Sequence, residues 1–237
     1  MPRSLRLILP GVAVHIIQRG NDRKPCFRAD SDYLVYLAHL RQLSHKYQCS
    51  VHAYCLMTNH VHLLMTPAAA GASTALMRDL GQRYVQYFNG RHERTGTLWE
   101  GRFRSCLVES ARYVLACYRY IERNPMRAGI VDHPSGYLWS SYAVNSGMRS
   151  DPCVRPHAAY EELASAPEER YAAYRRLSDE RPDPLVQQAI RDATNAGLPL
   201  ASEAFKAHVL EPRGWKPMPG KPGPRAMSPM AVYAVER

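Results

Sequence analysis

The pattern of hydrophobic and polar positions predicts four short β-strands, the first from a run of β-branched residues and the second from alternation with a period of two. The predicted strands cover residues 12–19, 50–57, 60–66 and 102–108. Only Thr58 and Asn59 separate the second strand from the third, so these two strands should form an antiparallel hairpin. In the second strand, the alternation places one set of side chains on the same side: Val51, Ala53, Cys55 and Met57.

Apolar residues three or four positions apart predict three helices between and after these strands. The predicted helices cover residues 31–47, 74–89 and 110–124. Ser31 is a candidate N-cap of the first helix. Leucines recur at every third position along this helix, at Leu34, Leu37, Leu40 and Leu43. Gly90 follows the second helix, and Pro125 should end or kink the third near residue 124.

The order of these elements is β-α-β-β-α-β followed by a further helix, which predicts an α+β protein with a ferredoxin-like antiparallel sheet. The added helix carries tyrosines. Residues 148–211 contain short helical stretches separated by prolines and are expected to form a helical extension. Residues 212–237 hold six of the 18 prolines and are typical of a flexible basic tail. We therefore expect a main domain over residues 1–147, then the extension and the tail.

The charge of the chain is concentrated in the main domain and the tail. The 237 residues carry 31 Lys and Arg against 21 Asp and Glu, a net charge of +10. Residues 1–147 have a net charge of +9 and residues 212–237 one of +4, whereas residues 148–211 have one of −3. A basic main domain favours a polyanionic partner such as nucleic acid, because neutralised phosphates release their condensed counterions.

Composition excludes several classes of protein. Hydrophobic residues make up 46% of the chain, which argues against a collagen-like or wholly disordered protein. No apolar run approaches the ~20 residues of a membrane span, and we expect neither a membrane partner nor a signal peptide. The six cysteines form no Cys-x-x-Cys pair, a pattern typical of reduced, mostly buried thiols. We therefore expect a cytoplasmic protein.

The most informative short segment lies on the third predicted strand. His60 and His62 share one face of this strand, whereas Val61 and Leu63 point to the other face. If two helices cover the apolar face of the sheet, the histidines stand on its open face. Two neutral imidazoles side by side can chelate one divalent cation. The alternative is a pair of ordinary, half-exposed histidines on a strand.

The third predicted helix carries a second candidate for chemistry. Tyr113, Tyr120 and Asn124 fall close to one face of it, because they are seven and four residues apart. Tyr118 lies about 160° away from Tyr120 at ~100° per residue, and we expect it to pack in the core. If the face meets the histidine pair, the phenol is a nucleophile and the Asn124 oxygen a third metal ligand. The alternative is that Tyr113 and Tyr120 only pack.

Four segments, taken together and in this order, resemble the HUH single-tyrosine transposases, and most closely the REP-associated tyrosine transposases of bacteria. They are VHIIQRGN (14–21), MTNHVHLL (57–64), WEGRF (99–103) and YIERNPMRAG (120–129). The resemblance covers about residues 8–145, and it departs from the family pattern at Thr58, where relatives often carry Pro. It makes residues 1–147 the catalytic domain.

The resemblance implies a metal-dependent enzyme that cleaves and rejoins single-stranded DNA beside hairpins. It implies that His60 and His62 bind Mg²⁺ or Mn²⁺, that Tyr120 is the nucleophile and that Asn124 supplies a third metal ligand. Attack by the tyrosine leaves a 5′-phosphotyrosine and a free 3′-OH, which conserves the energy needed to rejoin strands. Relatives include monomers and domain-swapped dimers, so we expect a monomer or a homodimer.

A single-strand nuclease needs basic side chains along the DNA and aromatic rings that stack on bases. Seven arginines follow or alternate on the predicted strands, or recur every four residues beside Tyr120. They are Arg19, Arg23, Arg102, Arg104, Arg119, Arg123 and Arg127. Each is either a DNA contact or a solvated charge. Trp99 and Phe103 either stack on bases or pack in the core, and the tail either enters a minor groove or is a spacer.

Two other functions stay open at this point. One is a non-catalytic nucleic-acid-binding module of ferredoxin-like fold, which would bind without cleavage, although the sequence lacks the RNP aromatic pattern. The other is a metallohydrolase in which the histidine pair works with Glu100 or Glu122 as the base. Such an enzyme would release a free 5′-phosphate with no protein attached.

Overall fold

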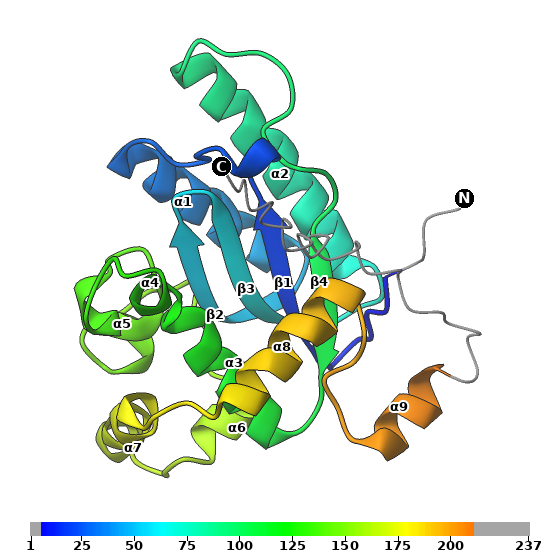
Figure 1. Cartoon of the computed structure of the whole chain (residues 1–237), viewed down its shortest axis with the longest axis vertical. Helices are drawn as coiled ribbons and strands as arrows, with labels where there is room; N and C mark the ends of the chain where they lie inside the picture. Colours follow the sequence, from blue (N-terminus) through cyan, green and yellow to red (C-terminus); the bar gives the residue numbers. More distant parts are fainter. Residues whose placement is uncertain (1–5, 211–237) are drawn as a thin grey trace, which may run out of the picture.

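A computed structural model of the chain describes residues 6–210, and the expected tail lies outside the described residues. A four-stranded antiparallel sheet forms its centre (Figure 1). The strands are β1 (Ala13–Arg19), β2 (Cys49–Met57), β3 (His60–Pro67) and β4 (Arg104–Val108). Their spatial order is β2-β3-β1-β4. With one helix between β1 and β2 and another between β3 and β4, this is the ferredoxin-like α+β fold predicted from the sequence.

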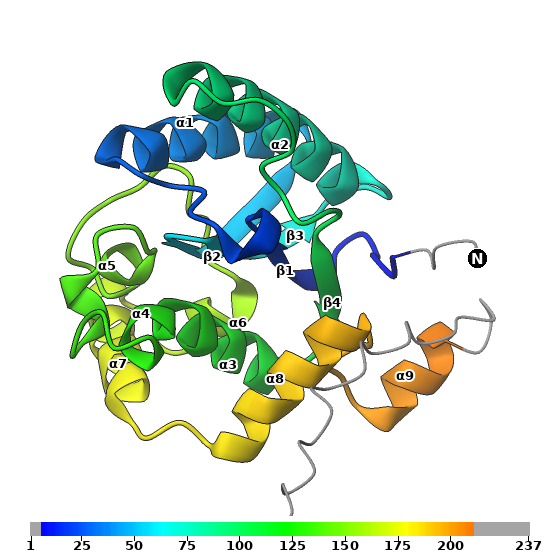
Figure 2. The same cartoon turned by 45° about the horizontal axis from the view of Figure 1, so that its top comes forward.

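Helices α1 (Asp30–Lys46) and α2 (Ala72–Arg91) cover one face of the sheet. Figure 2 shows them as one layer above the strands. Aliphatic and aromatic side chains that are almost fully buried fill the space between them, including Val14, Ile16, Leu63, Tyr36, Leu40, Leu80 and Tyr84. Each buried side chain of this size stabilises the fold by roughly 1.5–3 kcal/mol relative to its exposed state.

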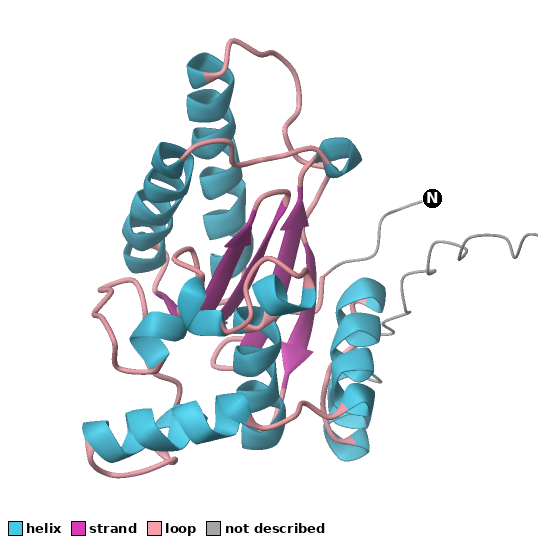
Figure 3. Ribbon diagram, turned by 60° about the vertical axis from the view of Figure 1, so that its left-hand side comes forward, coloured by secondary structure: helices cyan, strands magenta, loops and turns pink. Residues whose placement is uncertain are grey.

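The opposite face of the sheet is also covered, so the expectation of an open face is wrong. Helices α3 (Ala111–Glu122) and α8 (Pro184–Ala196) pack on it, α3 against β2 and β3 and α8 against β4 and β1. Figure 3 shows further helices around them. These are α4 (Asn124–Arg127), α5 (Tyr142–Asn145), α6 (Ala158–Glu161), α7 (Pro167–Asp179) and α9 (Glu203–Leu210). Helices α6, α7 and α8, which follow residue 147, complete this second core.

Two short 3₁₀ turns, η1 (Asn21–Arg23) and η2 (Pro134–Gly136), complete the described elements. No helix within residues 6–210 is long and apolar enough to cross a membrane. All six cysteines are buried and none of them forms a disulfide, as expected for reduced thiols.

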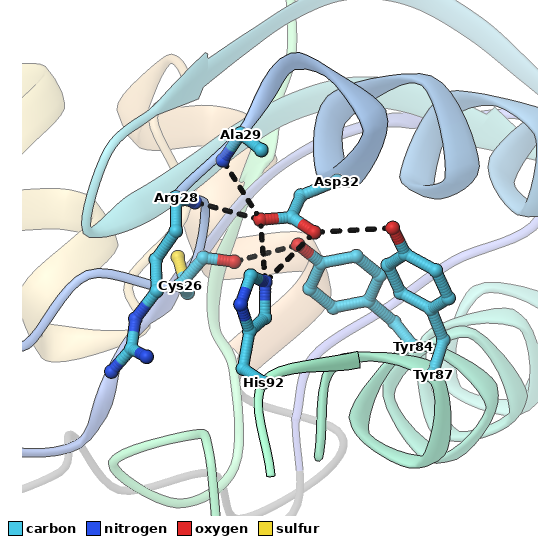
Figure 4. A network of polar contacts seen from close by, with 7 residues as sticks. All are labelled: Cys26, Arg28, Ala29, Asp32, Tyr84, Tyr87 and His92. Carbon is cyan, nitrogen blue, oxygen red and sulfur yellow. Dashed lines mark hydrogen bonds and ion pairs between the residues drawn. The ribbon is translucent and has the colours of Figure 1, made fainter. Parts of the chain in front are cut away.

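The start of α1 differs from the prediction. The helix begins at Asp30 rather than after Ser31, and the Asp32 carboxylate accepts hydrogen bonds from the backbone N–H groups of Arg28 (2.7 Å) and Ala29 (3.1 Å). Figure 4 shows that His92 of the α2 end also donates to Asp32. Burial alone would raise the pKa of Asp32, but these hydrogen bonds hold it below its ordinary value.

Only some of the regularly spaced leucines of α1 face the core. Leu34 is 60% exposed, whereas Tyr33 and Tyr36 take the inward positions beside Leu40 and Leu43. A spacing of three residues drifts around a helix of 3.6 residues per turn, so a run of four leucines cannot keep to one face. Buried residues spaced by three and four, as observed, do keep to it.

A β-bulge in β2 changes which side chains share a face. Val51 pairs with Met65, but Ala53 pairs with Leu64, so the register shifts across His52. Val51 therefore packs under α1 and α2, whereas Ala53, Cys55 and Met57 pack under α3. The prediction that all four share a face is wrong for Val51.

The break before Pro125 is confirmed. Helix α3 ends at Glu122, Arg123 has turn-like backbone angles, and α4 starts at Asn124 with Pro125 in its first turn. Gly90, in contrast, lies inside α2 rather than beyond it. This break starts a new helical turn at Asn124, next to the end of α3.

Segments that follow α3 also pair with the outer strands of the sheet. Val154 forms a parallel bridge with Val51 of β2, and Ser140 forms an antiparallel bridge with Cys55. On the other side, Leu200 forms a parallel bridge with Val108 of β4. Its backbone N–H donates to Leu107 O at 2.8 Å.

Candidate functional site

The alternation of β3 brings the two predicted histidines to the face under α3 and α8. The rings of His60 and His62 lie 5.0 Å apart between centroids. Their neighbours Val61, Leu63 and Met65 lie in the core under α1 and α2, as the period of two predicts. His62 is almost fully buried and His60 partly so. The pair therefore lies on a covered face of the sheet, rather than on an open surface.

Tyr120 of α3 lies directly beside these histidines. The centroid of its ring is 5.9 Å from that of His62 and 5.8 Å from that of His15 on β1. Helix α3 is held in this position by Val114, Cys117 and Ile121, which are buried against the sheet. The structure thus brings the phenol to the imidazoles, although the two come from elements far apart in the sequence.

Asn124 is the first residue of α4 and is also buried in this site. A hydrogen bond to Asn124 partly opposes the lowering of the His60 pKa, so the carboxamide lies next to that imidazole. The Asn124 Nδ2 group has no hydrogen-bond partner within the described part of the chain. A buried, unpaired amide is uncommon, and it is one of the marks of a site shaped for a ligand.

The histidines of this site are neutral near pH 7. Burial, together with the positive charges of Arg19 and Arg127, lowers the pKa of His60 to about 4. Burial lowers the pKa of His15 to about 3 and that of His62 well below its ordinary value. Neutral imidazoles keep a lone pair for a metal ion. Residues 6–210 contain no group of three His, Cys, Asp or Glu side chains that could hold a metal ion. The groups predicted to bind one here are two imidazoles and a carboxamide.

The phenol of Tyr120 is protonated at neutral pH. Burial raises its pKa, and the nearby Arg127 and Arg191 work in the opposite direction. The Arg127 guanidinium lies 3.9 Å from the centroid of the Tyr120 ring. Cations over an aromatic face are attracted by its quadrupole, so Arg127 also fixes the ring.

A cavity of about 450 Å³ opens beside Tyr120, between α3, α4 and α8. Its walls are mostly apolar and include Leu115, Ala116, Met126, Val186 and Ile190. Four arginines stand around it: Arg112, Arg119, Arg123 and Arg127. We call this space the tyrosine cavity. Its volume and lining are suited to an unstacked nucleotide, with an apolar wall for the base and cations for the phosphates.

The predicted DNA-binding arginines fall into two groups. Four of them line a second cavity of about 370 Å³ at the end of β1 and β4: Arg19, Arg23, Arg102 and Arg104. We call it the arginine cavity. Arg119 of α3 donates a 2.6 Å hydrogen bond to Glu180 O, and Arg123, directly after α3, donates one of 2.5 Å to Ser178 O. These two therefore also hold α3 to the end of α7.

The aromatic candidates pack rather than stand free. Trp99 is 7% exposed and lies against Tyr36 and Tyr84 in the core under α1 and α2. Phe103 is buried under the guanidinium of Arg6, 3.7 Å from the centroid of the ring. Tyr118 is fully buried in the second core, as expected. Tyr113 is partly buried at the edge of that core.

Glu122, one of the two candidate bases, points away from this site. It is fully buried and accepts hydrogen bonds from Ser141 (2.5 Å), Asn145 (2.7 Å) and Tyr174 (2.5 Å). Burial raises its pKa to about 7. A carboxyl enclosed by three protein donors has no path to a phosphate, so Glu122 joins α3 to α5 and α7 instead. Glu100, the other candidate base, lines the arginine cavity.

Sequence reasoning missed two residues of the site, His15 and Thr194. His15 Nε2 lies 3.0 Å from His62 Nδ1, and His15 Nδ1 lies 2.9 Å from Thr194 Oγ1. The period of two already places His15 on the same face of β1 as Arg19, but the pattern does not say which strand lies next to β1. Nothing in the sequence pairs Thr194 with a strand some 180 residues earlier.

Comparison with known proteins gives a consistent result. The model of a family described as transposase IS200-like matches residues 9–124. A solved structure of a REP-associated tyrosine transposase bound to a REP hairpin has a TM-score of 0.52 and 14% identity, and the match covers 67% of this chain and 93% of that chain. A protein of Deinococcus radiodurans R1 described as a transposase has a TM-score of 0.36 and 19% identity, over 54% of this chain and 92% of that chain. No curated protein sequence matches significantly.

Proposed function

Because this chain belongs, through residues 9–124, to the IS200-like transposase family, we propose that it is a metal-dependent transposase of single-stranded DNA. It cleaves and rejoins DNA next to hairpins through a 5′-phosphotyrosine intermediate. The observation that carries this proposal is the position of the Tyr120 ring, 5.9 Å from the ring of His62, which in turn lies 5.0 Å from the ring of His60. The proposed nucleophile and the uncharged side chains proposed to bind a metal ion therefore lie next to each other in one buried site.

The donor set of this site is suited to a divalent cation, Mg²⁺ or Mn²⁺. His60 and His62 would hold it through their imidazole nitrogens, and Asn124 through its carboxamide oxygen. Three protein donors leave coordination positions for oxygens of the DNA. When bound, the cation withdraws charge from the scissile phosphate and stabilises the leaving oxygen.

Tyr120 performs the covalent step. Its phenolic oxygen attacks the phosphorus, the bond from phosphorus to the 3′-oxygen breaks, and that oxygen takes up a proton to become a free 3′-OH. The phenol gives up its own proton to solvent, and Arg127 over the ring favours the charged form. The phosphotyrosyl ester keeps the energy of the original phosphodiester, so a 3′-OH can reverse the step and join strands without ATP.

The arginines supply the DNA path. The arginine cavity lies on the same face of the sheet as the histidines, because Arg19 pairs with His60 across β1 and β3. Arg119, Arg123 and Arg127 lie around the tyrosine cavity on the other side of the site. The strand would pass between the two groups, with its hairpin outside them. The solved relative with the same fold is bound to a REP hairpin, which supports a hairpin partner here.

The assembly and the compartment are part of the same proposal. The chain acts as a monomer or a homodimer. Six buried cysteines without a disulfide support a reducing compartment, and we place the protein in the cytoplasm.

The test uses the full chain, Mn²⁺ and a hairpin DNA with a single-stranded flank labelled at its 3′ end. The proposal expects a labelled protein band on a denaturing gel, because the 5′-phosphate of the labelled fragment becomes attached to Tyr120. A 5′ label should instead appear on a shorter free strand that ends in 3′-OH. A labelled free strand with a 5′-phosphate would identify a metallohydrolase. Retarded but uncut DNA with every divalent metal would identify a non-catalytic binding module.

A further inference from the structure

A chain of hydrogen bonds runs from the proposed metal ligand His62 to helix α8. His62 Nδ1 lies 3.0 Å from His15 Nε2, and His15 Nδ1 lies 2.9 Å from Thr194 Oγ1. The two imidazole rings are nearly parallel, with 9° between their planes. All three residues are at least 97% buried, so solvent does not compete for these contacts. These hydrogen bonds link β3, β1 and α8 through side chains alone.

The direction of each hydrogen bond follows from Thr194. Its hydroxyl donates to the backbone carbonyl of Ile190, one helical turn earlier, at 2.7 Å. A hydroxyl has one hydrogen, so Thr194 Oγ1 must accept from its other neighbours. His15 Nδ1 therefore carries the proton and donates a hydrogen bond to Thr194 Oγ1. The thiol of Cys106, whose sulfur lies 3.2 Å from the same oxygen, donates as well.

The same reasoning fixes the two histidines. A neutral imidazole has one N–H, so His15 Nε2 has a lone pair and accepts a hydrogen bond from His62 Nδ1–H. His62 then has its lone pair on Nε2. For His60, Nδ1 lies 2.7 Å from Asn59 Oδ1, which can only accept, so its lone pair is also on Nε2. Both proposed ligands thus present the same nitrogen.

We propose that His15 and Thr194 are positioning residues, which fix the tautomer and the ring angle of His62 so that its Nε2 can bind a divalent cation. This inference rests on the metal site proposed above. Hydrogen bonds to the far nitrogen of a ligating histidine orient the ring and set which nitrogen is free, and their loss typically weakens metal binding about 10–100-fold. His60 obtains this support from its own neighbour in the chain, whereas His62 obtains it from a distant helix.

A consequence is that α8, which lies in the extension, takes part in building the metal site. The helix has its own stop signal, Gly197 with φ of 71°, three residues beyond Thr194. Its N-cap Asp183 accepts a 2.8 Å hydrogen bond from the backbone of Leu185. Because α8 is capped at both ends, it offers Thr194 at a fixed position over β1 and β4.

The test compares three substitutions in the full chain. Thr194→Val keeps the shape but removes the hydroxyl, and Thr194→Ser keeps the hydroxyl. Thr66→Val is the matched control, because Thr66 makes the same type of contact, 2.8 Å to His52 Nε2, away from the site. Mn²⁺ affinity without DNA is measured by electron paramagnetic resonance. We expect about tenfold weaker binding for Thr194→Val, and less than about a twofold change for Thr194→Ser and Thr66→Val.

A second measurement needs no metal. Long-range ¹H–¹⁵N NMR of the metal-free wild-type protein should show the proton of His62 on Nδ1. In Thr194→Val, part of it should move to Nε2. A proton on Nε2 of His62 in the wild type, or wild-type Mn²⁺ affinity in folded Thr194→Val, would overturn the inference. If the wild type shows the expected tautomer but binds Mn²⁺ no better than His60→Ala or His62→Ala, the proposed metal site is wrong instead.

Discussion

The two faces of the central sheet have the same strands and very different interiors. Under α1 and α2, β1 and β3 present Val14, Ile16 and Leu63 to a core of aliphatic and aromatic side chains. Under α3 and α8, the alternate residues of these strands include His15 and His62, and every proposed catalytic group lies on this side. Because side chains alternate along a strand, neighbouring residues of the same strand face two different environments.

The difference between the faces has an energetic side. Apolar side chains need only a well-packed volume, whereas a buried polar group costs about 1–3 kcal/mol if it lacks a hydrogen-bond partner. The second face meets this requirement with connected contacts: Thr194 for His15, His15 for His62, and three donors for Glu122. We therefore expect changes under α1 and α2 to affect stability, and changes under α3 and α8 to affect the chemistry or the pH dependence of stability.

The strongest test of this contrast is Tyr120→Phe, on the second face. The substitution removes only the phenolic oxygen, which we propose as the nucleophile, so covalent DNA adducts should fall by at least about a thousandfold, while the melting temperature stays close to that of the wild type. Adduct formation is measured on denaturing gels with 3′-labelled DNA. Tyr113→Phe, on the same helix but at the edge of the core, is the control and should react normally. Normal adducts from Tyr120→Phe would place the nucleophile elsewhere, with Tyr113 as the next candidate.

The counterpart on the first face is Leu80→Ala. Leu80 is fully buried between α2 and the sheet, so the lost contacts and the cavity left behind should lower the free energy of unfolding by about 2–5 kcal/mol. Urea denaturation measures this change. At a temperature where the variant is folded, its Mn²⁺ affinity should match that of the wild type. A large loss of Mn²⁺ affinity in the folded variant would show that the two faces are coupled.

Glu122→Gln examines pH dependence on the second face. Burial raises the pKa of Glu122 from its ordinary 4.5 to about 7, so between these pH values the folded protein holds a proton that the unfolded chain has released. The proton on Glu122 therefore makes its full contribution to the free energy of unfolding below pH 4.5. As the pH rises to 7, the free energy of unfolding falls by about 3 kcal/mol. The glutamine variant lacks this loss, so it should gain stability relative to the wild type across this range. Denaturation curves of both proteins at pH 4.5, 6 and 7.5 measure their free energies of unfolding. The same pH dependence in the wild type and in Glu122→Gln would contradict the prediction.

The smallest effect is expected from a single arginine. Arg102 is exposed and lines the arginine cavity, and Arg102→Ala should weaken binding of single-stranded DNA several-fold. Because one phosphate contact is lost, the dependence of log affinity on log salt should also become less steep by about 1. Fluorescence anisotropy at several salt concentrations measures both. The control is Arg91→Ala, an exposed arginine of α2 on the opposite layer, and equal losses in the two variants would mean that charge alone matters.

Much of the fold could be predicted because periodicity is a local property. The four strands and the three helices of the main domain begin and end within two residues of their predicted positions. The faces of β3 and the position of Tyr120 on α3 were correct for the same reason. Local patterns failed where a single inserted residue changes the register, as at His52 in β2.

The cover over the histidines could not be predicted from local patterns. Helix α8 reaches the sheet from residues 184–196, and Thr194 has no sequence feature that marks it as a partner of His15. Long-range packing decides this contact, as it decides that Trp99 and Phe103 pack inside the protein. The division at residue 147 and the role of each arginine in binding DNA stay predictions.

The bridges at the two outer strands restrict how copies of this chain can meet. Exposed edges of a sheet have free N–H and C=O groups, which invite a strand from another molecule. Here Val154 and Ser140 occupy positions along β2, and Leu200 occupies a position along β4. Strand addition, the simplest route both to β-augmented dimers and to fibrils, is therefore blocked at these positions. Where these segments lie, a second copy would have to dock through helices and loops and could not extend the sheet.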